Sequence, residues 1–253
     1  MVLGAQMYNL RTYAQTERDL DRSLERVAAI GYKTVQISGI GNIPAKKVRA
    51  ACDRHGLEVV LTHMNADRII DDTDAVIREN EEMGCGYIGI GMMPERYRSE
   101  AWLDQFPIDY LPAAKKIAAA GKLLMYHNHS FEFAKINGSR VMDFLAEKFA
   151  PSEMGFTIDT YWMQAGGADI IDWIEKLKGR MPCVHLKDMD VLADQGVVMA
   201  PIMEGNLNFP KILKALKADG GVKYLLIEQD HCQESPFVCL EKSYNNLAAL
   251  GYR

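Results

Sequence analysis

The chain of 253 residues lacks several features that would assign it to a particular class of protein. It has five cysteines and no CxxC pair, so neither a disulfide framework nor a cysteine-rich zinc site is indicated, and we expect buried free thiols. No run of eighteen apolar residues occurs, and the opening MVLGAQMYNL is too short and lacks the basic leader of a signal peptide. These absences predict a protein of the reducing cytoplasm that does not bind a membrane.

Charge of one sign is not concentrated anywhere along the chain. The 29 Lys and Arg residues stand against 34 Asp and Glu residues, which gives a net charge of −5. Without a basic block to neutralise phosphates, a nucleic acid partner is not expected. A glycine-rich GxGxxG fingerprint is also missing after the first apolar run, which disfavours a dinucleotide-binding fold.

The composition, 48% hydrophobic and 25% charged, is that of a globular protein with a large core. Short runs rich in β-forming residues alternate with amphipathic segments of helical period along the whole sequence. The runs expected to form strands are 3–8, 33–38, 57–63, 87–92, 123–129, 155–159, 183–188 and 223–229.

The segments between these runs carry helix start and stop signals. From Thr16 to Ile30 apolar residues recur on one stripe, and Gly31 follows, the residue type favoured just past a helix end. Other helices are expected to start near Pro44, Asp72, Asp109, Arg140, Asp169 and Asn208. Eight β/α units predict an α/β protein, a (β/α)8 TIM barrel that forms a single domain over residues 1–253. The longest irregular stretches, 92–108, 130–140 and 189–207, all follow a strand and are expected over the carboxyl-terminal face, where active sites of this fold lie.

Polar side chains stand at the carboxyl-terminal ends of the expected strands. The stretch KLLMYHNHSFEF ends in His127, His129 and Glu132, and the next three strands end near Asp159, His185 and Glu228. Side chains of one parity share a face of a strand, so these groups would converge at one end of the barrel. Gln36, Thr62 and His63 would either line the same pocket or fill the layer beneath it, and His231 is expected on a loop.

Three carboxylates and an imidazole brought together require a compensating cation or strongly raised carboxyl pKa values. A metal ion is the simpler solution, which makes Glu132, Asp159, His185 and Glu228 the expected ligands. A donor set dominated by oxygen without thiolate favours Mn²⁺ or Mg²⁺ and is compatible with Co²⁺ or Zn²⁺. For His127, a buried hydrogen-bonded position one layer beneath the site is an equally good interpretation.

The motifs YHNHSFEF, IDTYW, VHLKD, EGNLNFP and LIEQD occur in this order at spacings that resemble those of the sugar phosphate isomerase/epimerase group of xylose isomerase-like TIM barrels. The opening LGAQMYNLR and the segment IGIGMMPERY are similar to that group too, so the resemblance covers nearly the whole chain. It implies a divalent metal held by the same four residues, Glu132, Asp159, His185 and Glu228. It further implies that Glu132 and Glu228 are the catalytic acid/base pair.

The resemblance also suggests substrate contacts. Lys187, two residues after the metal histidine, is implied to touch substrate oxygens, although it could instead neutralise Asp188 or Asp190. The other expected substrate-binding residues are His127, His129, Trp162, Glu204 and Asp230.

Two departures from the family pattern limit this transfer. Met203 stands where many relatives have the first glycine of a GEG motif, so the backbone freedom of that glycine is missing. The histidine with which sugar epimerases often grip the substrate is absent after Asp159, where Trp162 is expected to stack on a ring or pack under the loop.

The function indicated by these features is metal-dependent isomerisation or epimerisation of a sugar or keto-sugar, phosphorylated or not, by proton transfer through an enediolate. A lyase or dehydratase would begin with the same proton abstraction, and a non-catalytic sugar-binding protein could keep the barrel. A multi-zinc phosphodiesterase is disfavoured, because it needs more than the six histidines present and a basic surface. The expected partners are a small carbohydrate and, since relatives often pair, a second copy of the chain.

Overall fold

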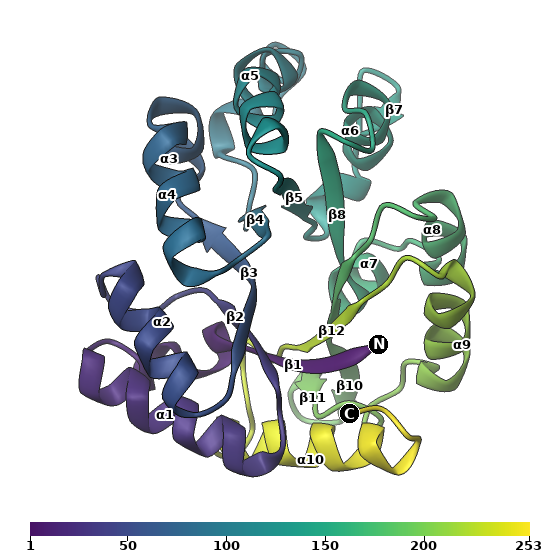
Figure 1. The fold of residues 1–253 in the computed structure, drawn as a ribbon. Helices are drawn as coiled ribbons and strands as arrows, with labels where there is room; N and C mark the ends of the chain where they lie inside the picture. The colour runs from purple at the N-terminus through teal and green to yellow at the C-terminus, as the bar shows by residue number, and fades with distance from the viewer.

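Eight parallel strands close into a barrel in the computed structural model, which describes residues 1–253 (Figure 1). Around the barrel they follow the order β1-β12-β9-β8-β5-β4-β3-β2, and the ring is closed where Val2 of β1 pairs with Tyr224 of β12. The strands are β1 (Val2–Gln6), β2 (Thr34–Ile37), β3 (Glu58–Met64), β4 (Tyr87–Ile90), β5 (Leu123–His127), β8 (Met154–Asp159), β9 (Cys183–Leu186) and β12 (Tyr224–Ile227). This confirms the expected single-domain (β/α)8 barrel and all eight expected strands.

Helices surround the barrel on its outside, and α10 at the end of the chain packs beside α1 near its beginning (Figure 1). The α-helices are α1 (Glu17–Ile30), α2 (Ala45–Arg54), α3 (Ala66–Asp71), α4 (Thr73–Met83), α5 (Gln105–Ala119), α6 (Val141–Lys148), α7 (Thr160–Ala165), α8 (Ile170–Lys176), α9 (Phe209–Asp219) and α10 (Pro236–Ala249). The 3-10 helices are η1 (Met7–Tyr13), η2 (Glu95–Tyr97) and η3 (Phe131–Phe133). None of these helices has the length and the apolar character needed to cross a membrane.

The ends of α1 follow from its sequence. The hydroxyl of Thr16 accepts a hydrogen bond from the backbone N–H of Asp19, and Gly31 ends the helix with a φ of 126°. The helix α5 begins at Gln105, one turn before the expected start at Asp109. Asp109 instead lies inside the first turns, where its carboxylate accepts a hydrogen bond from the Gln105 side chain at 2.7 Å.

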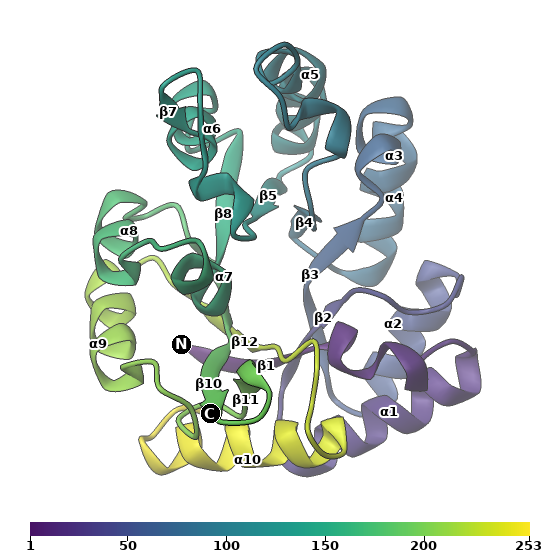
Figure 2. The same ribbon diagram turned by 180° about the vertical axis from the view of Figure 1, so that it is seen from behind.

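Two small antiparallel hairpins occur in stretches expected to be irregular. One pairs β6 (Lys135–Ile136) with β7 (Ser139–Arg140), and the other pairs β10 (Asp188–Leu192) with β11 (Gly196–Ala200). The second hairpin follows β9 directly and is seen near α10 in Figure 2. Both hairpins, like α3 and α7, lie in connections that leave the carboxyl-terminal ends of strands, so they surround the face on which the site is expected.

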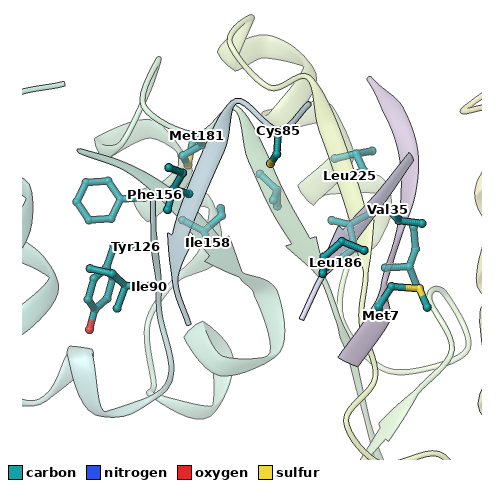
Figure 3. Packing of buried hydrophobic residues seen from close by; sticks show 14 of the residues in the cluster. Met7, Val35, Cys85, Ile90, Tyr126, Phe156, Ile158, Met181, Leu186 and Leu225 are labelled. Atoms are coloured by element: carbon teal, nitrogen blue, oxygen red, sulfur yellow. The ribbon is translucent and has the colours of Figure 1, made fainter. Parts of the chain in front are cut away.

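The buried apolar residues form two separate layers, one on each side of the strands. The larger layer lies between barrel and helices, and Figure 3 shows it with Tyr126, Phe156, Ile158, Leu186 and Leu225 among its members. The smaller layer comprises Val60, Leu61, Met125, Cys183 and Leu226. Since residues of opposite parity separate into the two layers on β5, β9 and β12, the smaller layer fills the barrel interior. Side chains that follow the parity of Met125, Cys183 and Leu226 toward the strand ends therefore point into the barrel mouth.

Candidate metal centre and active-site pocket

Four buried side chains meet at the mouth of the barrel. One donor atom each from His127, Asp159, His185 and Glu228 lies within 4.8 Å of every other. They stand at the carboxyl-terminal ends of β5, β8, β9 and β12, four strands that are neighbours in the barrel. Three of them are among the ligands expected from the sequence, and the fourth, His127, takes the place expected for Glu132.

Hydrogen bonding fixes which nitrogen of His127 faces the cluster. Its Nδ1 lies 3.0 Å from the carbonyl oxygen of Gly91, and because a carbonyl only accepts, Nδ1 carries the proton. Its Nε2 then faces Asp159 Oδ2 at 3.4 Å. Burial disfavours the charged imidazolium, but the carboxylates of Asp159 and Glu228 outweigh it and raise the pKa of His127.

His185 is oriented in the same manner by a residue on a distant strand. Its Nε2 lies 2.6 Å from the side-chain oxygen of Gln36 on β2, an acceptor that holds the proton on Nε2. Burial lowers the pKa of His185, which favours the neutral ring with a lone pair on Nδ1. That lone pair faces Glu228 Oε2 at 2.9 Å, and neither atom has an aligned hydrogen-bond partner.

Two acceptors at this distance repel each other unless a cation lies between them. A separation of 2.9 Å is short for two acceptors without a bridging group, and a divalent ion bound by both would remove the repulsion. The side-chain oxygen of Gln36 and the carbonyl of Gly91 also provide the outer hydrogen bonds that metal-ligating histidines usually make. The residues present therefore fit a divalent metal.

The two carboxylate oxygens of Asp159 have different roles, since one caps a helix and the other faces the cluster. Oδ1 accepts the backbone N–H of Trp162 at 2.9 Å and so caps α7, which leaves Oδ2 toward the cluster. Burial by itself would raise the pKa of Asp159, but the positive charge of Lys187 lowers it. The carboxylate is thus ionised and oriented by the start of the helix that follows its strand.

Lys187 brings a buried ammonium group to the same place. Its Nζ lies 3.0 Å from Asp159 Oδ2 and 2.9 Å from both Glu228 Oε2 and Asp230 Oδ2. Its side chain is 1% exposed, and the three carboxylates raise its pKa against the effect of burial. Three carboxylates and one ammonium leave a formal charge of −2, which one divalent cation would neutralise.

The alternative in which Lys187 neutralises Asp188 or Asp190 is not what the structure shows. Asp188 instead accepts backbone N–H groups from four residues, and three of these, Met203, Gly205 and Leu207, belong to the loop before α9. Asp188 thereby holds that loop in place.

A pocket of about 510 Å³ opens above the cluster. Six residues expected at the site from the sequence line it: His127, His129, Trp162, Lys187, Glu228 and Asp230. The ring centroids of His129 and Trp162 are 5.3 Å apart, and burial lowers the pKa of His129 to about 3. The pocket thus combines an aromatic wall with a neutral imidazole, a carboxylate pair and an ammonium group.

Glu132 lies on the other side of β5 from this pocket. It is fully buried, does not line the pocket, and is outside the group of four donors. Its Oε1 accepts a hydrogen bond from the hydroxyl of Tyr126 at 2.7 Å, and its Oε2 accepts the backbone N–H of His129 at 2.8 Å. Tyr126 belongs to the outer layer of the core (Figure 3), so this carboxyl packs between barrel and helices. Burial raises its pKa to about 7.

Glu204 is also not brought to the pocket. Its carboxylate lies 3.8 Å from Lys242 Nζ on α10, and both side chains are about 40% exposed. The preceding Met203 adopts a φ of 70°, the left-handed region that favours glycine. Met203 thus adopts the backbone conformation that a glycine would favour at this position of the loop.

Several residues that line the pocket were not among the site residues predicted from the sequence. Tyr8, Arg11, Ser38, Met92 and His231 line the pocket, and so does His63 on β3, which had two open interpretations. Space for His63 comes from the glycine that directly follows the neighbouring strand β4, because a Cβ at Gly91 would lie 2.9 Å from His63 Nδ1. The alternating glycines of YIGIGM were the available signal for this contact.

An eight-stranded β/α barrel with carboxylate and imidazole groups at the carboxyl ends of four strands defines a TIM-barrel protein with a candidate metal centre. The sequence profile of the xylose isomerase-like TIM barrel family matches residues 24–238, and the chain belongs to this family. The resemblance drawn from the motifs is confirmed at this level. None of the curated proteins matches the chain in a sequence comparison.

Similar solved structures come from proteins of several activities. A sugar phosphate isomerase/epimerase from Parabacteroides distasonis ATCC 8503 is 23% identical, with a TM-score of 0.81 over 98% of this chain and 93% of that one. An L-ribulose 3-epimerase is 16% identical, with a TM-score of 0.75 over 99% and 94% of the two chains. The IolI protein, with a bound zinc atom, is 14% identical, with a TM-score of 0.73 over 99% and 98%. At these identities the likeness shows the shared fold.

Proposed function

We propose that this protein is a divalent-metal-dependent isomerase or epimerase of a sugar or keto-sugar. The observation that carries the proposal is the pair of opposed acceptors, His185 Nδ1 and Glu228 Oε2, at 2.9 Å in a buried cluster that opens into a pocket. The family assignment and the sugar isomerases and epimerases among the similar structures support a carbohydrate substrate. The proposed substrate class includes phosphorylated and unphosphorylated sugars.

The metal would be held by His127 Nε2, Asp159 Oδ2, His185 Nδ1 and Glu228 Oε2. This set has two oxygen and two imidazole donors, which is less strongly oxygen-rich than the set expected from the sequence. Mn²⁺ and Mg²⁺ remain the first candidates. The second imidazole suits Co²⁺ and Zn²⁺ better than the set of three carboxylates and one imidazole expected from the sequence. When bound, such an ion would supply Lewis-acid stabilisation of the negative charge that develops on adjacent substrate oxygens.

The residues of the pocket would position the substrate and move the proton. Lys187, held by Asp159, Glu228 and Asp230, would donate hydrogen bonds to a substrate oxygen as it becomes negative. Glu228 lines the pocket, and its pKa is lowered: burial opposes the charge, but the ammonium of Lys187 favours it. An ionised carboxylate beside the substrate can accept the proton on the carbon next to the carbonyl. Trp162 and His129 would cover the ring or chain of the substrate.

The acid/base role of Glu132 stays a prediction from the resemblance. Its carboxyl would have to leave Tyr126 and cross the edge of β5 to touch a substrate. If it does not, its hydrogen bond to the backbone N–H of His129 makes it a positioning residue for the segment that carries His129 into the pocket.

The experiment that tests the proposal is deuterium incorporation from solvent into a panel of keto sugars, in the presence of Mn²⁺. We expect label at a carbon next to the carbonyl without loss of water from the sugar, in the wild-type protein but not in the Glu228→Gln variant. Label accompanied by dehydration would assign the site to a lyase. Absence of label, together with absence of stoichiometric metal after reconstitution, would refute the enzymatic proposal.

A further inference from the structure

Two cysteine side chains face one small cavity beside the loop that carries three pocket residues. This loop, residues 228–235, joins β12 to α10, and its pocket residues are Glu228, Asp230 and His231. Cys232 follows them directly, and Cys239 lies in the first turns of α10, near enough that each thiol shifts the pKa of the other. Both side chains line one small cavity under the loop.

The two thiols differ from the other three in the chain. Cys52, Cys85, Cys183 and Cys239 are all buried, but burial raises the pKa of both Cys52 and Cys85 to about 12. Cys232 is partly exposed, so a small oxidant can reach its thiol from solvent. The neighbouring Cys232 lowers the pKa of Cys239, which favours the thiolate that reacts with oxidants.

We propose that Cys232 and Cys239 are a modification site, at which a peroxide forms a reversible disulfide that ties the pocket loop to α10. One thiol would be oxidised by the peroxide to a sulfenic acid, with the release of one water molecule. The second thiol would then attack the sulfenic sulfur, form the S–S bond and release a second water molecule. In sum, two thiols lose two electrons and two protons, and one hydrogen peroxide is reduced to two waters.

The loop is anchored at its start, so the new bond would restrain its remainder. The backbone N–H of Gln229 is held by Asn9 at 2.6 Å, and the carbonyl of Asp230 accepts a hydrogen bond from Arg11 at 2.9 Å. In the reduced protein Cys232 Sγ also lies 3.8 Å from the carbonyl oxygen of Gln229. A disulfide would exchange this weak contact for a covalent bond to α10, and the segment with His231 would be fixed between two anchors.

The test uses the reduced full-length protein treated with hydrogen peroxide and then analysed by thiol titration and mass spectrometry. We expect the free thiols to fall from five to three, with a mass loss of about 2 Da that a dithiol reverses. A peptide linked through Cys232 and Cys239 should appear, and amide hydrogen exchange across residues 229–235 should slow at least several-fold. These readouts do not require any enzymatic activity, so their failure is distinct from failure of the proposed function.

Matched variants separate this pair from general oxidation. Cys232→Ser and Cys239→Ser should each show no loss of 2 Da, whereas Cys52→Ala should form the same bridge and pass from four thiols to two. Single-residue sulfinic acid without a linked peptide would overturn the proposal. So would a bridge between other cysteines, or a Cys232–Cys239 bridge that leaves hydrogen exchange of the loop unchanged.

Discussion

Nε2 of His185 on β9 and the side-chain oxygen of Gln36 on β2 are 2.6 Å apart, across the barrel interior. The contact decides which nitrogen of the ring faces the carboxylates, so Gln36 would control metal binding without touching the metal. We predict that Gln36→Leu weakens metal affinity by about 10–100-fold, measured by isothermal titration calorimetry. Gln36→Glu keeps an acceptor at this position and should restore most of the affinity. Equal affinity in Gln36→Leu and wild type would show that the ring is held by other contacts.

Glu132 and Glu228, which the sequence predicted to act as a pair, should differ in their effect on metal binding. Glu228→Gln removes one of the four clustered donors, and we expect it to lose stoichiometric metal. Glu132→Gln should retain the metal, because its carboxyl lies beside Tyr126 on the outer side of β5. Metal content after reconstitution, measured by mass spectrometry, tests both, with the exposed Glu204→Gln as the control. Loss of metal in Glu132→Gln would contradict the prediction and indicate that Glu132 is a metal ligand.

Glu132 should also make stability depend on pH. Its pKa is about 7 in the folded protein and 4.5 in a free chain, so below pH 4.5 its carboxyl is protonated in both states. As the pH rises from 4.5 to 7 only the unfolded state loses this proton readily, and the free energy of unfolding falls by at most about 3 kcal/mol. We predict that urea denaturation between pH 4.5 and 8 shows this fall in wild type and a smaller one in Glu132→Gln. Parallel curves for the two proteins would contradict the prediction.

Lys187 should contribute most to the free energy of unfolding when no metal is bound. Without its ammonium, Asp159, Glu228 and Asp230 would face each other in a buried site, so we predict that Lys187→Met in the presence of a chelator loses about 3–5 kcal/mol of unfolding free energy. A divalent metal should then raise the melting temperature of the variant more than that of wild type. Lys242→Met, which breaks an exposed pair with Glu234, is the matched control and should change stability by less than about 1 kcal/mol. Similar losses in the two variants would refute the prediction.

The left-handed conformation of Met203 gives a prediction about the loop before α9. A β-branched residue is strongly disfavoured at a φ of 70°, so Met203→Val should destabilise the protein by about 1–3 kcal/mol. Met203→Gly removes the backbone strain and loses some packing, and we expect it to stay within about 1 kcal/mol of wild type. Thermal or urea denaturation of the two variants measures the difference. A Val variant as stable as the Gly variant would mean that the loop readily adopts another conformation.

The sequence predicted the barrel well because each strand and helix carries its own signal. Alternation of β-rich runs with amphipathic segments, and glycines such as Gly31 at helix ends, depend on local physics alone. The hairpins within 130–140 and 189–207 were missed, since their pairing depends on turns at positions such as Asn137–Gly138 and Gly196.

The site was predicted unevenly for a geometric reason. Asp159, His185 and Glu228 lie at strand ends, where parity gives the direction of each side chain. Glu132 comes five residues after His127, beyond the end of β5 and in a 3-10 turn, where parity no longer applies. His127 keeps the parity of Met125 and so points into the barrel, which makes it the better candidate ligand on the rule that selected the others.

The pairing of β12 with β1 has a consequence for synthesis of the chain on the ribosome. Until residues 224–227 emerge, β1 and β9 each present an unpaired edge to solvent, and such edges invite association with other chains. Glu228 leaves the ribosome after the other three clustered donors, and Asp230 and its anchor Arg11 meet only when the first and last strands join. A nascent chain therefore carries most of its barrel but has no complete metal centre. The four donors cannot capture an ion together before the ring closes.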